Sequence, residues 1–441
     1  MKLSKLALSV LVALAANSAQ ATDLIEVYQA AQGQDAAFAA ARASRQAGQE
    51  KQSQGRSYLM PSVNLTANST FNDINVQFPT GSRDLRYNNS GYGVSLVQPL
   101  FRQQNWMAYS SAEIQVVISE AQYQAAQHDL ILRVAQGYFD VLVAKDNVQL
   151  TEAQKQAISE QLEQAKRNFE VGTATITDTY EAQARYDLIL AQEINAQSNL
   201  EVKKRALQQV TNASTGELRQ LGQELKLETP QPLDVEKWVE DAQLHNVQIT
   251  IAEAAAQLAD KEVSRSLGGH LPTIDLVANY AMNSANGGTF NGTGYGPADT
   301  TSKVVGVQLN MPLFQGGATQ SKYREADANR EKAKQDLENA RRSVAVQTRQ
   351  AYLGVASGIA QVKALQQALK SSESLLEASK LGQGVGVRTN LDVLNAQQQL
   401  FSTRRDLYQA EYNYLISRLR LKAAVGTLSD EDLKGVNQAL R

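Results

Sequence analysis

The feature that most constrains this chain is that its sequence repeats itself at a spacing of slightly more than two hundred residues. Pro61-Ser62-Val63-Asn64-Leu65 matches Pro272-Thr273-Ile274-Asp275-Leu276, and Pro99-Leu100-Phe101 matches Pro312-Leu313-Phe314. Tyr138 likewise matches Tyr352, and Val171-Gly172 matches Val385-Gly386. Because these landmarks keep their order and nearly constant spacing, they indicate an internal tandem duplication. We therefore expect two copies of one structural unit.

The positions of the eight prolines show where long helices can lie. None falls within 100–171 after Pro99 or within 313–385, and a proline inside a helix costs about 3 kcal/mol. In the second stretch a heptad seam of small and apolar residues recurs in steps of four and three: Val344, Thr348, Ala351, Val355, Gly358, Val362, Leu365, Leu369, Ser372, Leu376 and Ser379. Tyr352, Ile359 and Leu375 lie off this seam, so the helix has a second contact line, as a closed ring of helices requires. The pattern predicts long helices over 102–171, 175–213, 314–381 and 389–425.

Four shorter segments alternate polar and apolar residues, which predicts strands at about 61–72, 87–99, 272–283 and 302–312. Each has about the length of a tilted transmembrane strand. A soluble sheet would alternate in the same way, but a secretory signal and the lack of apolar helical spans favour a membrane barrel. Four strands cannot close a barrel, and lipid does not tolerate open edges. The strands must therefore be shared among two, three or four copies.

The ends and composition of the chain restrict its class. Lys2 and Lys5, an apolar stretch over 6–16 and the sequence Ala19-Gln20-Ala21 predict a signal peptide over residues 1–21. The net charge of −2 gives no electrostatic reason to expect nucleic acid. The absence of cysteine excludes disulfides and a lipid-modified N-terminal cysteine. Histidines are isolated and no catalytic motif is present, so we expect no enzyme, no cofactor and no structural metal.

Several motifs together resemble the TolC family of outer membrane efflux proteins, and the resemblance covers the chain after the signal peptide. These motifs are Tyr412-Asn413-Tyr414-Leu415-Ile416, Ala424-Val425-Gly426-Thr427-Leu428, Val171-Gly172 with Ile176-Thr177-Asp178, and Val385-Gly386-Val387-Arg388-Thr389 with Leu391-Asp392-Val393-Leu394. The resemblance implies an α+β membrane protein that forms a homotrimer. In it, a 12-stranded outer-membrane β-barrel, with four strands per subunit, continues into a long periplasmic α-helical barrel.

The same resemblance implies a division of the chain and a set of partners. The first structural repeat would occupy 22–213 and the second 246–426, with an equatorial segment at 214–245 and a C-terminal equatorial tail at 427–441. The protein would lie in the outer membrane of a Gram-negative bacterium, among its lipids, and extend into the periplasm. It would act with a periplasmic membrane-fusion (adaptor) protein and an inner-membrane RND, ABC or MFS transporter, in multidrug efflux or type I protein secretion.

The resemblance also places a gate where the long helices end. Thr177, Asp178 and Arg388 match positions that link helices in the closed state, and Asp392 matches an aspartate that rings the constriction. The family's second aspartate falls on Asn395 and its locking tyrosine on Gln383, which would loosen the gate or give it different contacts. Three converging carboxylates would attract cations and bind a blocking divalent ion at the Asp392 ring.

Local structure offers a second interpretation of these residues. Thr175 with Asp178 and Thr389 with Asp392 have the spacing of capping boxes, in which an acidic side chain stabilises the first helical turn. The tips would dock the adaptor through Val171, Gly172, Thr173, Val385, Gly386 and Val387, but glycine there also ends a helix at low cost. Two other functions remain open at this point: a secreted coiled-coil structural or adhesion protein, and a constitutively open diffusion porin.

Overall fold

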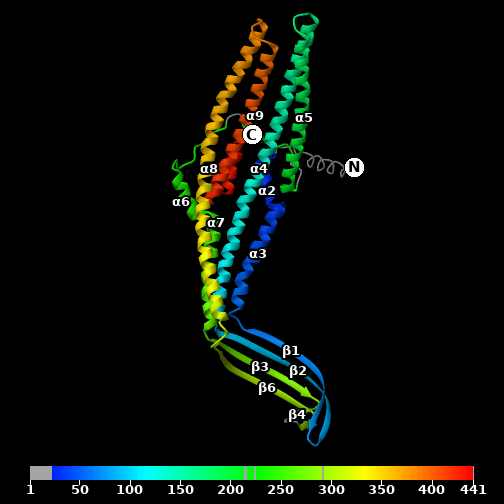
Figure 1. Cartoon of the computed structure of the whole chain (residues 1–441), viewed down its shortest axis with the longest axis vertical. Helices are drawn as coiled ribbons and strands as arrows, with labels where there is room; N and C mark the ends of the chain where they lie inside the picture. Colours follow the sequence, from blue (N-terminus) through cyan, green and yellow to red (C-terminus); the bar gives the residue numbers. More distant parts are fainter. Residues whose placement is uncertain (1–21, 213–215, 223–224, 291–292, 441) are drawn as a thin grey trace, which may run out of the picture. The chain divides into compact units, whose positions relative to one another are not determined.

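The computed structural model describes residues 22–212, 216–222, 225–290 and 293–440, so the predicted signal peptide lies outside the described residues. The chain divides into two compact units. Among the described residues, the helical unit comprises 22–43, 122–212, 216–222, 225–249 and 340–440, and the sheet unit comprises 44–121, 250–290 and 293–339. Figure 1 shows both units with the elements named below.

The elements follow one another in two matching series. The first series is α2 (Leu24–Gln34), α3 (Ala36–Ser57), β1 (Ser62–Phe78), β2 (Gly81–Phe101), α4 (Gln103–Glu170) and α5 (Ile176–Thr211). The second is α6 (Val235–His245), α7 (Val247–Leu267), β3 (Thr273–Ala285), β6 (Ala298–Asn310), α8 (Ala318–Gly384) and α9 (Asn390–Val425). Four short elements complete the described chain: η1 (Gly268–His270), β4 (Gly288–Phe290), β5 (Thr293–Tyr295) and α10 (Asp430–Asn437).

The long helices lie where the proline-free stretches predict them. The helix predicted over 102–171 corresponds to α4, which has 68 residues and is about 100 Å long at 1.5 Å per residue. The helix predicted over 314–381 corresponds to α8, which begins four residues later and ends three residues later. Every residue of the heptad seam in α8 is buried or half-buried. Tyr352 is half-buried and Ile359 is buried, whereas Leu375 on the second contact line is exposed.

The structure places the start of the second repeat earlier than residue 246. The N-cap residues of α2 and α6 are Asp23 and Asp234, and their C-cap residues are Asp35 and Asn246. The two N-caps are 211 residues apart, and so are the two C-caps. Helix α6, which the sequence assigned to the equatorial segment, is therefore the counterpart of α2. The two copies are also anchored alike, because buried Tyr138 donates hydrogen bonds to the carbonyls of Thr22 and Arg219, and Tyr352 donates one to the carbonyl of Leu233.

The four long strands form one antiparallel sheet in the order β1-β2-β3-β6. Strands β1 and β2 have 17 and 21 residues and run well past the predicted limits of 72 and 87. The prediction ended these strands where the sequence turns polar, but cross-strand pairs such as Asp73 with Arg86 continue the ladder to the turn at 79–80. Strands β1 and β6 are the edges of this sheet.

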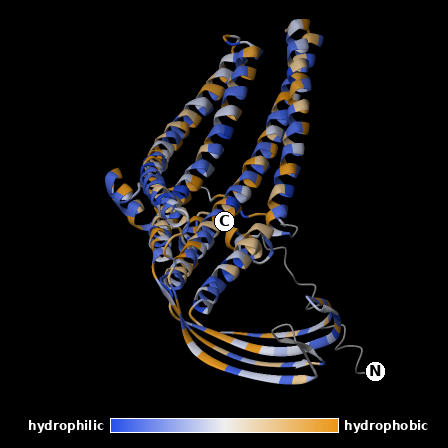
Figure 2. Ribbon diagram, turned by 60° about the horizontal axis from the view of Figure 1, so that its bottom comes forward, coloured by the Kyte–Doolittle hydropathy of each residue, from blue (hydrophilic) through white to orange (hydrophobic). Residues whose placement is uncertain are grey.

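Apolar side chains collect on one face of the sheet, here called the apolar face. The alternation of hydropathy along the strands is visible in Figure 2. The exposed members of the apolar face are Val63, Leu65, Phe71, Tyr92, Val94, Tyr280, Val305, Val307 and Leu309. The opposite face, here called the polar face, carries Asn64, Asn68, Asn279 and Asn283. Among the described helices, none is long and apolar enough to cross a membrane.

An acidic pair lies between α4 and α9 in the helical unit. Tyr412 of α9 donates a hydrogen bond of 2.8 Å to Asp146 of α4, and its ring lies against that of Phe139 with the centroids 5.5 Å apart. Burial raises the pKa of the Asp146 carboxyl. Burial, together with the nearby Asp146, raises the pKa of Glu411 to about 7. Because this folded-state pKa lies above that of the unfolded chain, ionisation of Glu411 destabilises the fold, and stability falls as the pH rises from about 4.5 to about 7.

The Glu411→Gln variant is therefore expected to be more stable than the parent protein, by about 1–3 kcal/mol at about pH 8 and by much less at about pH 5. Thermal unfolding of the detergent-solubilised protein at both pH values measures the difference. Glu377→Gln on an exposed face of α8 is the matched control and should change neither midpoint. An equal gain at both pH values would show that the pKa of Glu411 does not differ between the folded and unfolded chains.

Candidate functional site: the helical tips

The two helical hairpins, α4–α5 and α8–α9, end in turns with the same backbone geometry. Gly172 and Gly386 both have φ of 77°, a left-handed conformation that glycine adopts without strain. The amide of Thr173 donates to the carbonyl of Asn168 at 2.8 Å, and the amide of Val387 donates to the carbonyl of Gly382 at 2.9 Å. The duplication has therefore produced two copies of one tip.

Each second helix of a hairpin begins with a capping box. Asp178 Oδ2 accepts hydrogen bonds from the amide and the hydroxyl of Thr175 at 2.9 and 2.8 Å. Asp392 Oδ2 accepts the same two bonds from Thr389, both at 2.9 Å. The hydrogen bonds from Thr389, with the charge of Arg388 nearby, lower the pKa of Asp392, so its carboxylate stays ionised. Capping therefore accounts for one oxygen of each aspartate.

Arg388 distinguishes the second tip from the first. Its Nη1 lies 3.8 Å from Asp392 Oδ1, and its side chain passes over Gly382. A Cβ atom at Gly382 would lie 2.7 Å from Arg388 Cγ, so glycine makes room for the arginine. The equivalent residues of the first tip are Asn168 and Ala174. Within the described chain, Arg388 makes no hydrogen bond or ion pair with Thr177 or Asp178.

The two predicted departures from the family pattern have different surroundings. Gln383 Nε2 donates to Asn390 Oδ1 at 3.2 Å, a bond within the second tip. Asn395 Oδ1 instead accepts from Arg185 Nη2 at 2.8 Å, while Arg185 Nη1 donates to Gln398 Oε1 at 3.0 Å. Arg185 belongs to α5, so its guanidinium joins one hairpin to the other. Sequence reasoning missed this residue, because a contact across 210 residues leaves no local pattern.

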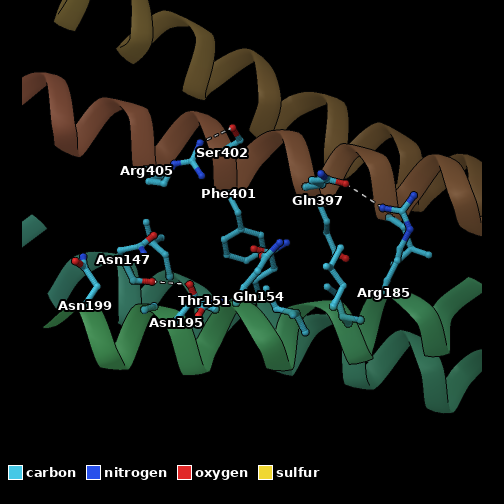
Figure 3. A pocket seen from close by; sticks show the side chains of 18 residues that line it. Asn147, Thr151, Gln154, Arg185, Asn195, Asn199, Gln397, Phe401, Ser402 and Arg405 are labelled. Carbon is cyan, nitrogen blue, oxygen red and sulfur yellow. Dashed lines mark hydrogen bonds between the residues drawn. The ribbon is translucent and has the colours of Figure 1, made fainter. Parts of the chain in front are cut away.

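A cleft of about 540 Å³ separates the two hairpins next to this link. Figure 3 shows Phe401 of α9 pointing across the cleft toward α4 and α5. Amide side chains such as Gln154 and Asn195 line much of the wall, and Arg185 and Arg405 are the charged residues of its lining. The hairpins are thus separated by a polar gap that Arg185 bridges at one end.

The tips also expose apolar side chains. Val171 is 73% exposed, Val385 69% and Val387 79%. Thr173 lies beside Val171 and donates its hydroxyl hydrogen to the carbonyl of Asn168 at 3.1 Å. An exposed valine adds little to the stability of the single chain, because its side chain stays in contact with water. Apolar groups exposed together on an ordered turn are typical of a docking surface. Across the described residues, no group of three or more acidic or histidine side chains is placed to hold a metal ion.

Comparison with known proteins identifies the family. The model of the outer membrane efflux protein family matches residues 27–213 and 238–427, one match for each repeat. Outer membrane protein TolC of Escherichia coli K12 is 35% identical over 96% of this chain and 85% of its own. The alkaline protease secretion protein AprF of Pseudomonas aeruginosa is 31% identical over 94% of this chain and 86% of its own.

Solved structures agree with the fold. The CmeC outer membrane channel of Campylobacter jejuni superposes with a TM-score of 0.79 at 17% identity, covering 95% of this chain and 90% of that one. VceC of Vibrio cholerae gives 0.77 at 18% identity, covering 91% of this chain and 96% of that one. With its two matched repeats, four-stranded sheet and long hairpins, the chain belongs to the outer membrane efflux protein family.

Proposed function

We propose that three copies of this chain form a passive outer membrane channel for efflux and type I secretion. The observation that carries the proposal is the sheet of the single chain, which has two unpaired edge strands, β1 and β6, and an exposed apolar face. In lipid, every backbone polar group needs a partner, so a sheet must close on itself. Pairing β1 of one copy with β6 of the next satisfies both edges.

The dimensions of the sheet fit an outer membrane. The 13 residues of β3 extend for about 44 Å at 3.4 Å per residue, or roughly 34 Å along the membrane normal at a tilt of about 40°. This length exceeds the apolar band of about 25 Å that such sheets present to lipid. The apolar face would then meet lipid, and the polar face would line a water-filled lumen.

The resemblance to the family and the size of the lumen both support three copies. Three copies of a four-stranded sheet give twelve strands, whereas an eight-stranded barrel has an interior that side chains fill. Asn64, Asn68 and Asn279 on the polar face would leave this wider lumen wet and without charge at those positions. The passage would therefore discriminate little, and selection of cargo would lie with the inner-membrane transporter.

The relatives support both kinds of export. AprF is named for secretion of alkaline protease, PrtF of Dickeya chrysanthemi for secretion of proteases, and BepC of Brucella suis as an outer membrane efflux protein. We infer that this chain likewise receives cargo from an inner-membrane RND, ABC or MFS transporter through a periplasmic adaptor. The exposed valines of the two tips would be the adaptor contact.

The helical tips would form the periplasmic gate. Three copies of Asp392 would ring the constriction, while Arg388 would reach Thr177 and Asp178 of a neighbouring copy in the closed state. Arg185 would hold the two hairpins of each copy together through Asn395, where the family has its second aspartate. Gln383 would hold the second tip internally rather than locking it to another helix.

Two other functions are separable by experiment. A secreted coiled-coil structural or adhesion protein would give no conductance and would be released from membranes by salt. A diffusion porin would give a stably open pore that no tip substitution widens. Conductance recorded from the same detergent-extracted sample in which subunits are counted by cross-linking tests the channel against both.

Asp392→Asn should weaken block of the single-channel current by a divalent cation such as Mg²⁺, raising the blocking concentration about tenfold for a loss of roughly 1.4 kcal/mol. Asparagine keeps an oxygen that can cap Thr389, so the helix start is preserved. Asp178→Asn is the matched control, because Asp178 forms the same capping box, and should leave the block unchanged. Equal weakening in both variants would assign the effect to capping rather than to a ring of charge.

Arg185→Ala should favour the open channel, because it removes the two hydrogen bonds by which Arg185 of α5 holds α9 near the tips. The expected result is a higher mean conductance in planar bilayers. Arg205→Ala is the control, because Arg205 lies on the same helix and bonds only to neighbouring Gln208. Unchanged conductance in Arg185→Ala would show that the link does not restrain the gate.

Cysteine at Val171 or Val385 should cross-link to the adaptor in intact cells, since both valines are exposed at the tips. The chain has no native cysteine, so any adduct reports the introduced site. Leu244→Cys, at a residue that is 77% exposed on α6, controls for exposure alone and should give no adaptor adduct. Absence of adducts from both tips would remove them from the docking surface.

A further inference from the structure

Strands β1 and β2 continue as a two-stranded ribbon beyond the rest of the sheet. Strand β3 ends at Ala285, which pairs with Asn89 of β2. The amide of Asn286 still donates a hydrogen bond to the carbonyl of Asn88 at 3.0 Å, and beyond it the ladder found among the described residues joins only β1 and β2, up to the turn at 79–80. We call residues 72–77 and 82–87 the distal ribbon.

The hydropathy pattern inverts between the sheet and the distal ribbon. In the sheet, most odd-numbered residues of β1 are apolar, including Val63, Leu65 and Phe71. In the distal ribbon, the even-numbered residues Ile74 and Val76 are apolar instead. Because side chains alternate between the two faces of a strand, these two residues lie on the continuation of the polar face, the face that carries Asn64 and Asn68 in the sheet.

The second strand of the ribbon follows the same inversion. Leu85 is directly opposite Ile74, and Tyr87 is opposite Asn72. The side chains on this face of the ribbon at Ile74, Val76, Leu85 and Tyr87 are half-buried. Arg83, opposite Val76, is exposed and lies toward the turn.

The other face of the ribbon is adapted to water. Asp73 and Arg86 form an exposed ion pair at 3.1 Å, and Asn75 donates a hydrogen bond to Asp84 at 2.6 Å. These residues continue the apolar face of the sheet, so the side that would meet lipid becomes charged within the ribbon. The ribbon therefore lies beyond the apolar band of the membrane.

We propose that the distal ribbons of three copies pack against one another through Ile74, Val76 and Leu85, over the outer mouth of the channel. This inference rests on the proposed trimer, in which the polar face of the sheet surrounds the lumen. The apolar side of each ribbon then points toward the channel axis, where the ribbons of the other two copies can cover the part of these half-buried side chains that the single chain leaves exposed. Strand β1 is also an edge of the sheet, so each ribbon begins at a subunit boundary.

Such a cluster would act as an outer gate, separate from the periplasmic tips. A narrow apolar constriction excludes water and ions until it is widened, and no charge needs to move. The long side chain of Arg83 reaches past the cluster to water at the turn. Cargo arriving from the periplasm would part the ribbons, because each is one strand pair, and among the described residues no third strand is paired with it.

Access of a bulky maleimide to a cysteine beneath the ribbons tests the proposal in intact cells. The reporter is Asn68→Cys on the polar face. It is labelled alone and in a second protein that also carries Ile74→Ser and Leu85→Ser. We expect slow labelling in the reporter alone and labelling several-fold faster when both apolar residues are replaced. The matched control replaces the opposite pair, Asp73→Ser and Arg86→Ser, and should label as slowly as the reporter. Equal rates in all three proteins would overturn the outer gate.

A second pair of variants separates this proposal from the channel itself. Leu85→Cys should form subunit-to-subunit cross-links on oxidation or with a short bis-maleimide, and Arg86→Cys on the outward face should not. With Ile74→Ser and Leu85→Ser present to open the ribbons, a small impermeant thiol reagent should reach Asn68→Cys but not Leu65→Cys on the apolar face. Failure of that last contrast would contradict the proposed barrel. Success there, with no cross-link at Leu85, would contradict the ribbon cluster alone.

Discussion

The interaction on which the rest depends is the backbone hydrogen bonding that β1 and β6 lack in the single chain. A sheet with two open edges and an exposed apolar face is stable in neither water nor lipid by itself. Joining edge to edge between copies satisfies the backbone and turns the apolar face outward. In a closed sheet whose apolar face points outward, the polar face points inward and surrounds a lumen. Oligomerisation, membrane insertion and a wet passage are thus consequences of one unsatisfied row of amides and carbonyls.

The duplication gives the chain two equivalent helical tips, so a residue that differs between them is a candidate for a role that only one tip has. Both tips share a glycine with φ of 77° and a capping box, which any hairpin of this kind needs. Only the second tip has the Gly382–Arg388 contact, where the first has Asn168 and Ala174. A duplicated element that diverges at exposed positions, while keeping its turn chemistry, has been changed for contacts outside its own helix.

Features with a sequence period were predictable, and features made by distant contacts were not. The seam from Val344 to Ser379 and the proline-free stretches indicated the long helices, because packing and proline leave regular marks. The strands were predicted too short, since the inverted alternation around Ile74 was not recognised as a continued strand. Arg185 was missed because its partner Asn395 lies 210 residues away and neither residue is unusual in its own helix.

The two interpretations of Asp392, as a helix cap and as a pore charge, are compatible. The hydrogen bonds from Thr389 occupy Oδ2 and stabilise the ionised carboxylate, which lowers its pKa. A carboxylate held this way cannot easily become neutral when three copies approach one another, although repulsion between them would otherwise raise the pKa. For Oδ1, the ion pair found among the described residues is the one with Arg388 Nη1 at 3.8 Å, which is too long for a hydrogen bond and leaves this oxygen able to bind a cation. The cap would therefore maintain the charge that the proposed constriction ring requires, and Arg388 would offset that charge or release it as the tips move.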